Sequence, residues 1–247
     1  MKLTITGSGD AFGSGGRFNT CFHVQSGGTG FLIDCGATAL VSLKRAGFST
    51  NDIDTIFITH LHGDHFGGLP FVLIDALFVA RRTKPLTIVG PAALEARFHV
   101  ACEAMFPRAT ENAREFDLTF QPLNEGEVTS VGTVSVTPFE VVHYSGAPSY
   151  ALRFALEDKV LAYSGDSGWT TALIEAGRDA DLYIMECYHY DVALKMHLDY
   201  LTIARHLDEI GARRVLFTHM SEAMLANADA VDDPRVSLAE DGMVIEV

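Results

Sequence analysis

Three histidines and one aspartate stand within six positions, directly after an apolar run that is typical of a buried strand. Segment 56–69 reads IFITHLHGDHFGGL and contains His60, His62, Asp64 and His65. Side chains two apart on an extended segment share a face, so His60 and His62 can converge on one point. Asp64 and His65 follow a glycine turn and can aim at a neighbouring point. Imidazoles and a carboxylate suit zinc or another divalent transition metal, and four ligands this close favour two ions over one.

Three further candidate ligands stand where predicted strands end. His143 follows Val141 and Val142, Asp166 lies in the sequence SGDSG, and His219 lies in LFTHMS. Each is a weak signal alone, because an aspartate at a strand end is more often a turn residue or a helix cap. As a set with the histidine cluster they complete two metal sites. A carboxylate such as Asp166 can bridge two cations and offset their repulsion.

Strands and helices alternate along the whole chain, without a repeat, a linker or a low-complexity segment. This pattern predicts one domain, residues 1–247, of the α/β or α+β class. The predicted strands are 3–6, 20–25, 31–34, 55–58, 86–89, 150–156, 159–163, 182–185, 215–218 and 243–246, with more within 116–139. The predicted helices are 38–46, 70–82, 91–105 and 200–210, the last capped by Asp199 and Gly211.

Composition limits the classes of partner that the protein is expected to bind and the compartment in which it is expected to lie. The formal net charge is -14, and an acidic surface repels phosphate backbones, so long nucleic acids are disfavoured as partners. The four cysteines form no CxxC pair and no disulfide pattern, and the N-terminus lacks the apolar run of a signal peptide. The most apolar stretch, 69–80, is short and contains Asp75, so it cannot span a bilayer. We therefore expect a cytoplasmic protein without a membrane partner.

At this point the sequence resembles the metallo-β-lactamase superfamily. HLHGDH matches its HxHxDH signature, and the three later candidates match its later ligand positions in order. The resemblance implies an α+β fold, a four-layer αββα sandwich with metals at one edge. It assigns His60, His62 and His143 to a first metal. Asp64, His65 and His219 would bind a second, with Asp166 between the two. It implies two divalent ions, with zinc expected and manganese or iron as alternatives.

Within that superfamily the chain is most similar to the ribonuclease Z branch of phosphodiesterases. The glycine-rich opening with Arg17 and Asn19, and PSYALRF after His143, resemble that branch. MEC at 185–187 and HLDYLTIA from His197 fall where the branch has a glutamate and an extra histidine. One departure is large, since only 23 positions separate His143 from Asp166. The long arm with which such enzymes bind transfer RNA is absent, and the proline that usually follows the glycine-rich start is missing.

These residues predict hydrolysis of a small or cyclic phosphodiester by a hydroxide that bridges two metals. Asp64 is expected to orient the hydroxide, and His197, held by Glu186, to protonate the leaving group. The small-molecule substrate could instead be a lactone, a thioester or a sulfate ester, because fold does not fix substrate. Processing of transfer-RNA 3′ ends and a non-catalytic binding role remain further alternatives.

Other features of the sequence stay open at this stage. The resemblance suggests a homodimer, but the periodicity identifies no interface. Tyr188, His189 and Tyr190 in CYHYD fit either a substrate pocket or loop packing. Neither the native substrate nor the native metal follows from the residues.

Overall fold

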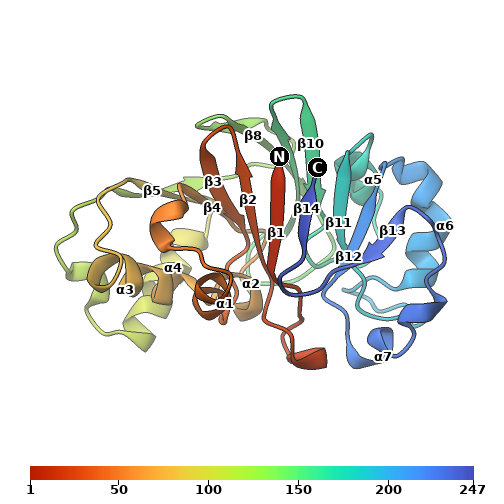
Figure 1. Ribbon diagram of the computed structural model, residues 1–247, viewed down its shortest axis with the longest axis horizontal. Helices are drawn as coiled ribbons and strands as arrows, with labels where there is room; N and C mark the ends of the chain where they lie inside the picture. Colours follow the sequence, from red (N-terminus) through yellow and green to blue (C-terminus); the bar gives the residue numbers. More distant parts are fainter.

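The computed structural model describes residues 1–247 and contains two mixed sheets of seven strands each (Figure 1). The first sheet has the order β14 (Val244–Glu246), β1 (Lys2–Gly7), β2 (Cys21–Ser26), β3 (Thr29–Ile33), β4 (Thr55–Phe57), β5 (Leu86–Gly90) and β6 (Leu118–Pro122). The second has the order β13 (Val236–Leu238), β12 (Val215–Thr218), β11 (Leu182–Glu186), β10 (Lys159–Tyr163), β9 (Tyr150–Leu156), β8 (Val134–Glu140) and β7 (Thr129–Val131).

The two sheets pack face to face through alternating apolar side chains. Phe31 and Phe57 from the first sheet meet Phe154 from the second, with ring centroids 5.1 to 5.6 Å apart. All three rings are fully buried, and burial of such a side chain contributes about 1.5–3 kcal/mol. The period of two along each strand thus provides an inner face for this core and an outer face for the helices.

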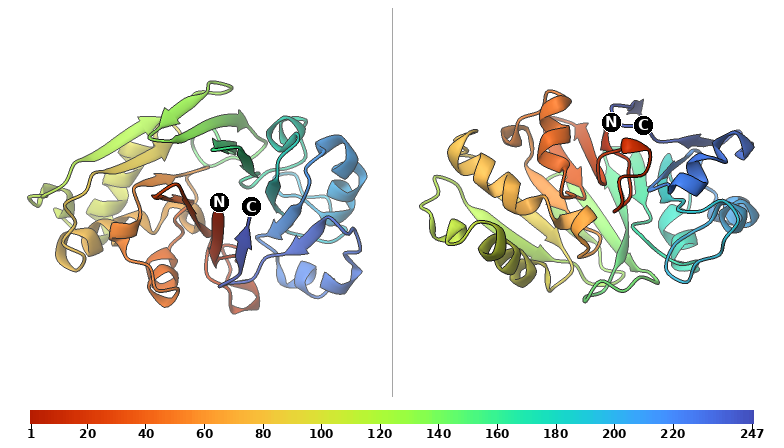
Figure 2. Two further views of the ribbon diagram at one scale, coloured as in Figure 1. Left: turned by 45° about the horizontal axis from the view of Figure 1, so that its top comes forward. Right: turned by 90° about the horizontal axis from the view of Figure 1, so that it is seen from below.

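Helices cover the outer face of each sheet. The first sheet is covered by α1 (Ala39–Arg45), α3 (Leu69–Phe78) and α4 (Leu94–Met105), and the second by α5 (Ala172–Gly177) and α6 (Tyr200–Ile210). Figure 2 shows the same division into layers from two further directions. Two short helices, α2 (Gly63–Phe66) and α7 (Glu222–Leu225), follow β4 and β12 at the lower edge in Figure 1. The layers are therefore helix, sheet, sheet, helix.

Strand direction brings several strand ends to this one edge. In the first sheet β4 is parallel to β3 and β5. In the second sheet β10, β11 and β12 are parallel, and β8 shares their direction because both β8 and β10 run antiparallel to β9. The residues that follow β4, β8, β10 and β12 consequently meet at the same edge of the sandwich.

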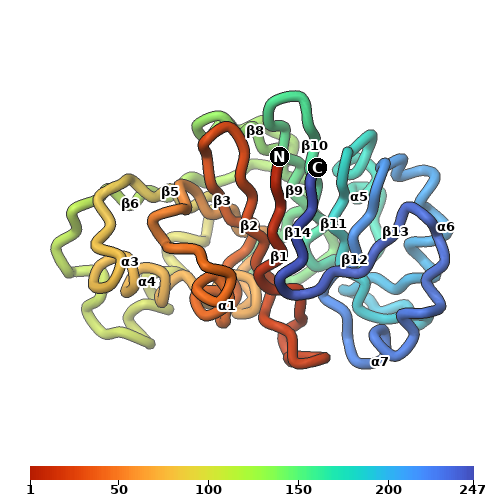
Figure 3. Tube along the Cα trace, in the orientation of Figure 1, coloured from red at the N-terminus to blue at the C-terminus, as the bar shows by residue number.

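The first and last strands of the chain pair with each other. Strand β14 pairs antiparallel with β1 and forms one edge of the first sheet, and Figure 3 shows the first and last segments side by side near the middle of the view. The segment after β1 then runs down to the edge where α7 lies, and includes the one-turn helix η1 (Ser14–Gly16). Three other one-turn helices are η2 (Thr50–Asp52), η3 (Ala109–Glu111) and η4 (Ala228–Ala230).

Two predicted helices have different bounds in the structure. The helix predicted over 70–82 ends at Phe78, because Arg82 turns inward and donates hydrogen bonds to the carbonyls of Thr50, Lys84 and Pro85. The helix predicted over 91–105 begins at Leu94, after a turn that starts at the proline. The sequence did not predict α2, α5, α7 or β13. No helix combines the length and apolar character that crossing a bilayer requires.

Candidate metal centre

The structure brings the seven sequence-predicted ligands together in two groups. The group formed by His60, His62 and His143 has its ligand atoms within 4.8 Å of one another. The ligand atoms of a second group also lie within 4.8 Å of one another, and this group consists of Asp64, His65, Asp166 and His219. The residues come from both sheets, since the first four predicted ligands follow β4 and the others follow β8, β10 and β12.

Asp166 lies between the two groups. Its Oδ2 atom is 3.7 Å from Nε2 of His60 and 3.9 Å from Nε2 of His143, which belong to the first group. The same oxygen is 3.4 Å from Nε2 of His219, and Oδ1 is 3.2 Å from Nε2 of His65. One buried carboxylate therefore faces both groups, as a bridging ligand would.

The donor atoms fit a divalent metal. Nε2 of His60, Nε2 of His65 and Oδ1 of Asp166 are buried and have no hydrogen-bond partner. Buried polar atoms without a partner cost about 1–3 kcal/mol each, and a bound cation would satisfy a cluster of them aimed at one another. Imidazole nitrogens with carboxylates are the donor set that zinc, manganese and iron accept.

A buried aspartate that the sequence analysis missed sets the orientation of two ligands. Asp34 directly follows β3, accepts hydrogen bonds from the backbone and hydroxyl of Thr59 at 2.8 Å, and lies 2.6 Å from Nδ1 of His65. Because Thr59 gives its proton to Asp34, its oxygen accepts from Nδ1 of His60 at 3.0 Å. The Nε2 lone pairs of His60 and His65 are thereby directed into the site.

The first group contains a similar support. Nδ1 of His143 donates to the carbonyl of Met196 at 2.9 Å, which leaves the Nε2 lone pair of His143 facing the site. That Nε2 is 2.9 Å from Nδ1 of His62. With Nδ1–H of His62 as the donor this contact is a hydrogen bond, and with that nitrogen deprotonated both nitrogens would bind one cation.

Burial and charge perturb the titration of the second group. Burial alone would lower the pKa of His65, but the charges of Asp166, Asp64 and Asp34 raise it well above its usual value. Burial alone would raise the pKa of Asp166, but His219 and His65 hold it well below its usual value. Three carboxylates around one imidazole create a strongly negative site that attracts positive charge.

His197 and Glu186 form a pair beside the ligands. Nδ1 of His197 is 2.9 Å from Oε2 of Glu186, whose other oxygen accepts from the backbone of Ser167. Glu186 is fully buried, whereas the His197 side chain is 25% exposed and can reach a substrate. Burial opposes protonation of His197, but the hydrogen bond and charge of Glu186 raise its pKa. One ligand-type atom of His197 lies within 4.8 Å of those of His143 and Asp166.

The three residues of the CYHYD segment separate in the structure. The ring of Tyr188 lies 4.9 Å from that of His197 and 6.0 Å from that of His219, so Tyr188 contacts the site. Tyr190 instead stacks on Tyr200 at the start of α6, as loop packing. His189 is 3.8 Å from Asp191 and makes no contact with the ligands.

Exposed apolar side chains adjoin His143 and the segment that supports it. Tyr144, directly after His143, is 78% exposed, and Val142 and Met196 are also exposed. The loops that carry them are joined by the hydrogen bond between His143 and Met196. Exposed apolar and aromatic side chains therefore adjoin the first ligand group in sequence.

Comparison with known proteins identifies relatives over almost the whole chain. The family model described as "Anti-Pycsar protein Apyc1" matches residues 1–245. The chain is 28% identical to the anti-Pycsar protein Apyc1 of Bacillus phage 010DV004 over 235 residues, which cover 91% of this chain and 90% of that protein. It is 32% identical to the ribonuclease Z of Lachnoclostridium phytofermentans over 144 residues. That second alignment covers 58% of this chain and 45% of the ribonuclease Z, less than half of its length.

Solved structures share the fold. The metallo-β-lactamase fold protein YhfI from Bacillus subtilis superimposes with a TM-score of 0.79 at 22% identity and covers 99% of both chains. The short form of human tRNase Z also gives 0.79, at 24% identity, and covers 100% of this chain and 99% of the other. The αββα sandwich and the resemblance to the ribonuclease Z branch are thus confirmed. The match over 1–245 and the shared fold together show that the chain belongs to the anti-Pycsar Apyc1 family of metallo-β-lactamase-fold hydrolases.

Proposed function

We propose that this protein is a dinuclear metal-dependent phosphodiesterase that hydrolyses a small or cyclic phosphodiester. The observation that carries the proposal is the arrangement of two ligand groups around Asp166, with the His197–Glu186 pair beside them. The relatives named ribonuclease Z, and a diphosphatase of the PhnP family with a TM-score of 0.79, support hydrolysis of a phosphate ester or anhydride. The charge of -14 and the short connection between His143 and Asp166 argue against a long RNA.

The metal ligands in this proposal follow the two groups. His60, His62 and His143 would hold one ion, Asp64, His65 and His219 would hold the other, and Asp166 would bridge them. Two bound divalent ions, of which zinc fits the donor set best, would lower the pKa of a shared water and offset negative charge on the phosphate.

The chain's own residues supply orientation and proton transfer. Oδ2 of Asp64 lies 3.3 Å from Nε2 of His65 and 3.2 Å from Nε2 of His219, at the position where the attacking water would be oriented. The leaving alkoxide needs a proton once the phosphorus–oxygen bond breaks. His197 gives that proton from Nε2, because Nδ1 is held by Glu186.

Two tyrosines near the candidate ligands favour a substrate with an apolar or aromatic group beside its phosphate. The ring of Tyr188 lies beside that of His197, and Tyr144, directly after His143, is largely exposed. An aromatic leaving group or a nucleobase could stack on such a ring at a gain of about 1–3 kcal/mol per base. We therefore include a cyclic mononucleotide among the test substrates.

Metal content and substrate scope test the proposal directly. The reconstituted protein is expected to bind two metals per chain and to hydrolyse bis(p-nitrophenyl) phosphate, and His65→Ala is expected to abolish turnover. The same preparation is assayed with a cyclic mononucleotide, a lactone, a thioester, a sulfate ester and a transfer-RNA precursor. Fewer than two metals, or faster turnover of a non-phosphate ester or of the RNA, would overturn the proposal in favour of the corresponding alternative.

The proton-donor role of His197 requires its own comparison. His197→Ala is expected to retain both metals and to lose more activity on a phosphodiester with an alkyl leaving group than on one with p-nitrophenolate. His206→Ala is the matched control, because His206 also pairs with a glutamate, at 3.3 Å, but its ring stacks on Trp169, at 4.0 Å between ring centroids, rather than on a candidate ligand. Equal losses on both substrates would exclude the role.

A further inference from the structure

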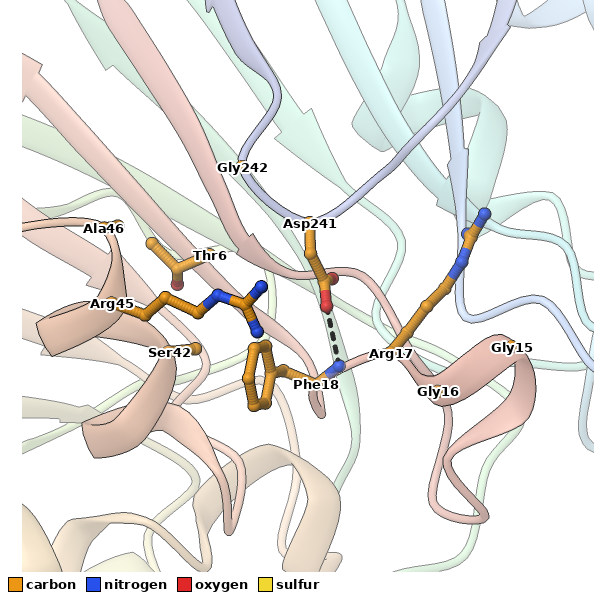
Figure 4. Close-up of a pocket in the computed structure, with 10 residues that line it drawn as sticks. All are labelled: Thr6, Gly15, Gly16, Arg17, Phe18, Ser42, Arg45, Ala46, Asp241 and Gly242. Atoms are coloured by element: carbon orange, nitrogen blue, oxygen red, sulfur yellow. Dashed lines mark hydrogen bonds between the residues drawn. The ribbon is translucent and has the colours of Figure 1, made fainter.

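One carboxylate near the C-terminus joins both ends of the loop that follows β1. Oδ1 of Asp241 accepts hydrogen bonds from the backbone and the hydroxyl of Ser8, both at 2.8 Å. Oδ2 of Asp241 accepts from the backbone of Phe18, also at 2.8 Å. Figure 4 shows the second contact, with the carboxylate pointing at the Phe18 nitrogen. Residues 8 and 18 are thereby fixed to a turn more than 200 positions away in sequence.

Hydrogen bonds of Ser8 connect the Asp241 side chain to a candidate metal ligand. Its carbonyl accepts hydrogen bonds from the backbone of His219 at 3.0 Å and from the hydroxyl of Thr218 at 3.2 Å. Ser8 is fully buried, so these bonds do not compete with water. His219 has a φ of 58°, a left-handed conformation that costs energy in a non-glycine residue and needs support from its surroundings.

The turn that carries Asp241 is itself anchored to both sheets. The backbone of Ala239 donates to Phe217 at 2.8 Å in β12, and that of Gly242 donates to Ile5 at 2.7 Å in β1. A guanidinium nitrogen of Arg17 donates to the carbonyl of Ala239 at 2.8 Å. Backbone hydrogen bonds to β12 and to β1 therefore hold the turn that carries Asp241.

Asp241 also lines a surface hollow, although its side-chain hydrogen bonds go to Ser8 and Phe18. This hollow has a volume of about 390 Å³ and is lined in part by Arg17, Phe18 and Arg45. In Figure 4 the Arg17 guanidinium points away from the hollow, and Arg45 lies over the Phe18 ring, 5.7 Å from its centroid. The contacts of Asp241 lie within the protein, on Ser8 and Phe18.

We propose that Asp241 is a positioning residue for the metal centre, an inference that rests on the proposed function. It fixes the loop between Ser8 and Phe18 and, through the Ser8 carbonyl, the backbone of His219. The C-terminal turn would therefore control how well His219 binds its metal, although Asp241 touches neither metal nor substrate.

The test compares Asp241→Asn with Asp233→Asn. The asparagine at 241 keeps an oxygen for Ser8 but turns an amide donor toward the Phe18 N–H. Asp233 is the matched control, because it also accepts three hydrogen bonds, from the backbone, Nε and Nη2 of Arg235, without a link to His219. Zinc affinity is measured by competition with a chromogenic chelator, alongside thermal unfolding. Hydrogen exchange of the His219 and Phe18 amides is measured on the metal-free protein.

We expect Asp241→Asn to weaken one of the two zinc-binding events about 10-fold and to speed exchange at both amides. Asp233→Asn should lower the melting temperature without either effect. Unchanged zinc affinity and unchanged His219 exchange in Asp241→Asn would overturn the proposal, as would equal effects of the two variants. If Asp241→Asn does not fold, Ser8→Ala removes only the hydroxyl contact and should show smaller changes of the same sign, and no change would refute the role.

Failure of the proposed function would look different. A wild-type protein that binds two zinc ions but hydrolyses no phosphodiester would refute that function and leave the zinc comparison intact. A wild type that binds no zinc would refute the metal centre, whereas the exchange rates would still decide whether Asp241 holds His219.

Discussion

Oδ2 of Asp34 lies 2.6 Å from Nδ1 of His65, and both side chains are fully buried. The aspartate also accepts two hydrogen bonds from Thr59, which in turn orients His60. Burial raises the pKa of Asp34, whereas His65 and Thr59 act in the opposite direction. One carboxylate thus organises a ligand in each of the two groups without belonging to either.

Replacement of this carboxylate is expected to weaken metal binding. In Asp34→Asn three donors face a side chain with a single acceptor oxygen, so one N–H or O–H loses its partner. Loss of such a supporting contact typically costs 10–100-fold in metal affinity or activity, and about 10-fold or more is expected here. Asp54→Asn is the control, since Asp54 accepts a backbone hydrogen bond from Gly30 at 3.1 Å in the same sheet, away from His65. Equal zinc affinities of the two variants would contradict this role.

A glycine beside the cluster has no room for a side chain. A Cβ atom added at Gly36 would lie 2.2 Å from the carbonyl oxygen of Asp64, so Gly36→Ala must displace α2 and its two ligands. Gly63→Ala is the comparison, because the same atom there meets nothing within 4 Å. We expect Gly36→Ala to lose metal and about 1–3 kcal/mol of stability, as overpacked sites do, and Gly63→Ala to bind metal normally. Normal zinc binding by Gly36→Ala would show that the backbone can move aside.

A buried histidine away from the metal centre predicts an acid-dependent loss of stability. His23 is fully buried against Phe48, at 4.0 Å between ring centroids, and neither ring nitrogen has a hydrogen-bond partner. Burial lowers the pKa of His23 to about 4, from an ordinary value of about 6.5. Below about pH 6.5 the unfolded chain takes up a proton that the folded chain refuses until about pH 4. Stability should therefore fall as the pH drops through this range.

Comparison with a variant that lacks His23 measures how much stability the wild type loses as the pH falls. Relative to His23→Leu, the wild type should lose up to about 1.4 kcal/mol of unfolding free energy per pH unit between pH 6.5 and 4. Urea unfolding of both proteins at pH 7.0, 5.5 and 4.5 measures the difference, and the titration of the ligand histidines cancels because both proteins share it. Parallel stability curves would mean that folding does not lower the pKa of His23.

The four cysteines should be unreactive in the native protein. All four are free and buried, and burial raises the pKa of Cys21 to about 12 and that of Cys102 to about 11. Only the thiolate reacts with a disulfide reagent, so native protein should release almost no thionitrobenzoate and denatured protein four equivalents. A rapidly reacting native thiol would reveal local opening of the surrounding strands.

Local sequence patterns predicted most elements with accurate bounds. Helix α6 runs over Tyr200–Ile210 as predicted, because its amphipathic period, the Asp199 cap and the left-handed Gly211 are all local signals. Strands β9, β10 and β12 also have the predicted bounds. Strand β13, at only three residues, depends on pairing with β12 rather than on its own pattern.

The candidate metal ligands could be proposed from the sequence because they follow the ends of strands, whereas their supporting contacts could not. Asp34 also follows the end of a strand, and that position was the available signal. Its role, however, depends on contact with His65, 31 positions later. The contribution of Met196 is a backbone carbonyl, which no side-chain pattern reveals.

Because the candidate ligands come from both sheets, the site can be completed only late in the synthesis and folding of the chain. Four candidate ligands are in place once β4 and α2 have been synthesised, but His219 follows β12, the twelfth of fourteen strands. A nascent or truncated chain that has folded only β1 to β6 cannot assemble either complete ligand group. Hydrolytic activity would therefore arise only when both halves of the sandwich have closed on each other, and a nick or deletion in either half would silence it.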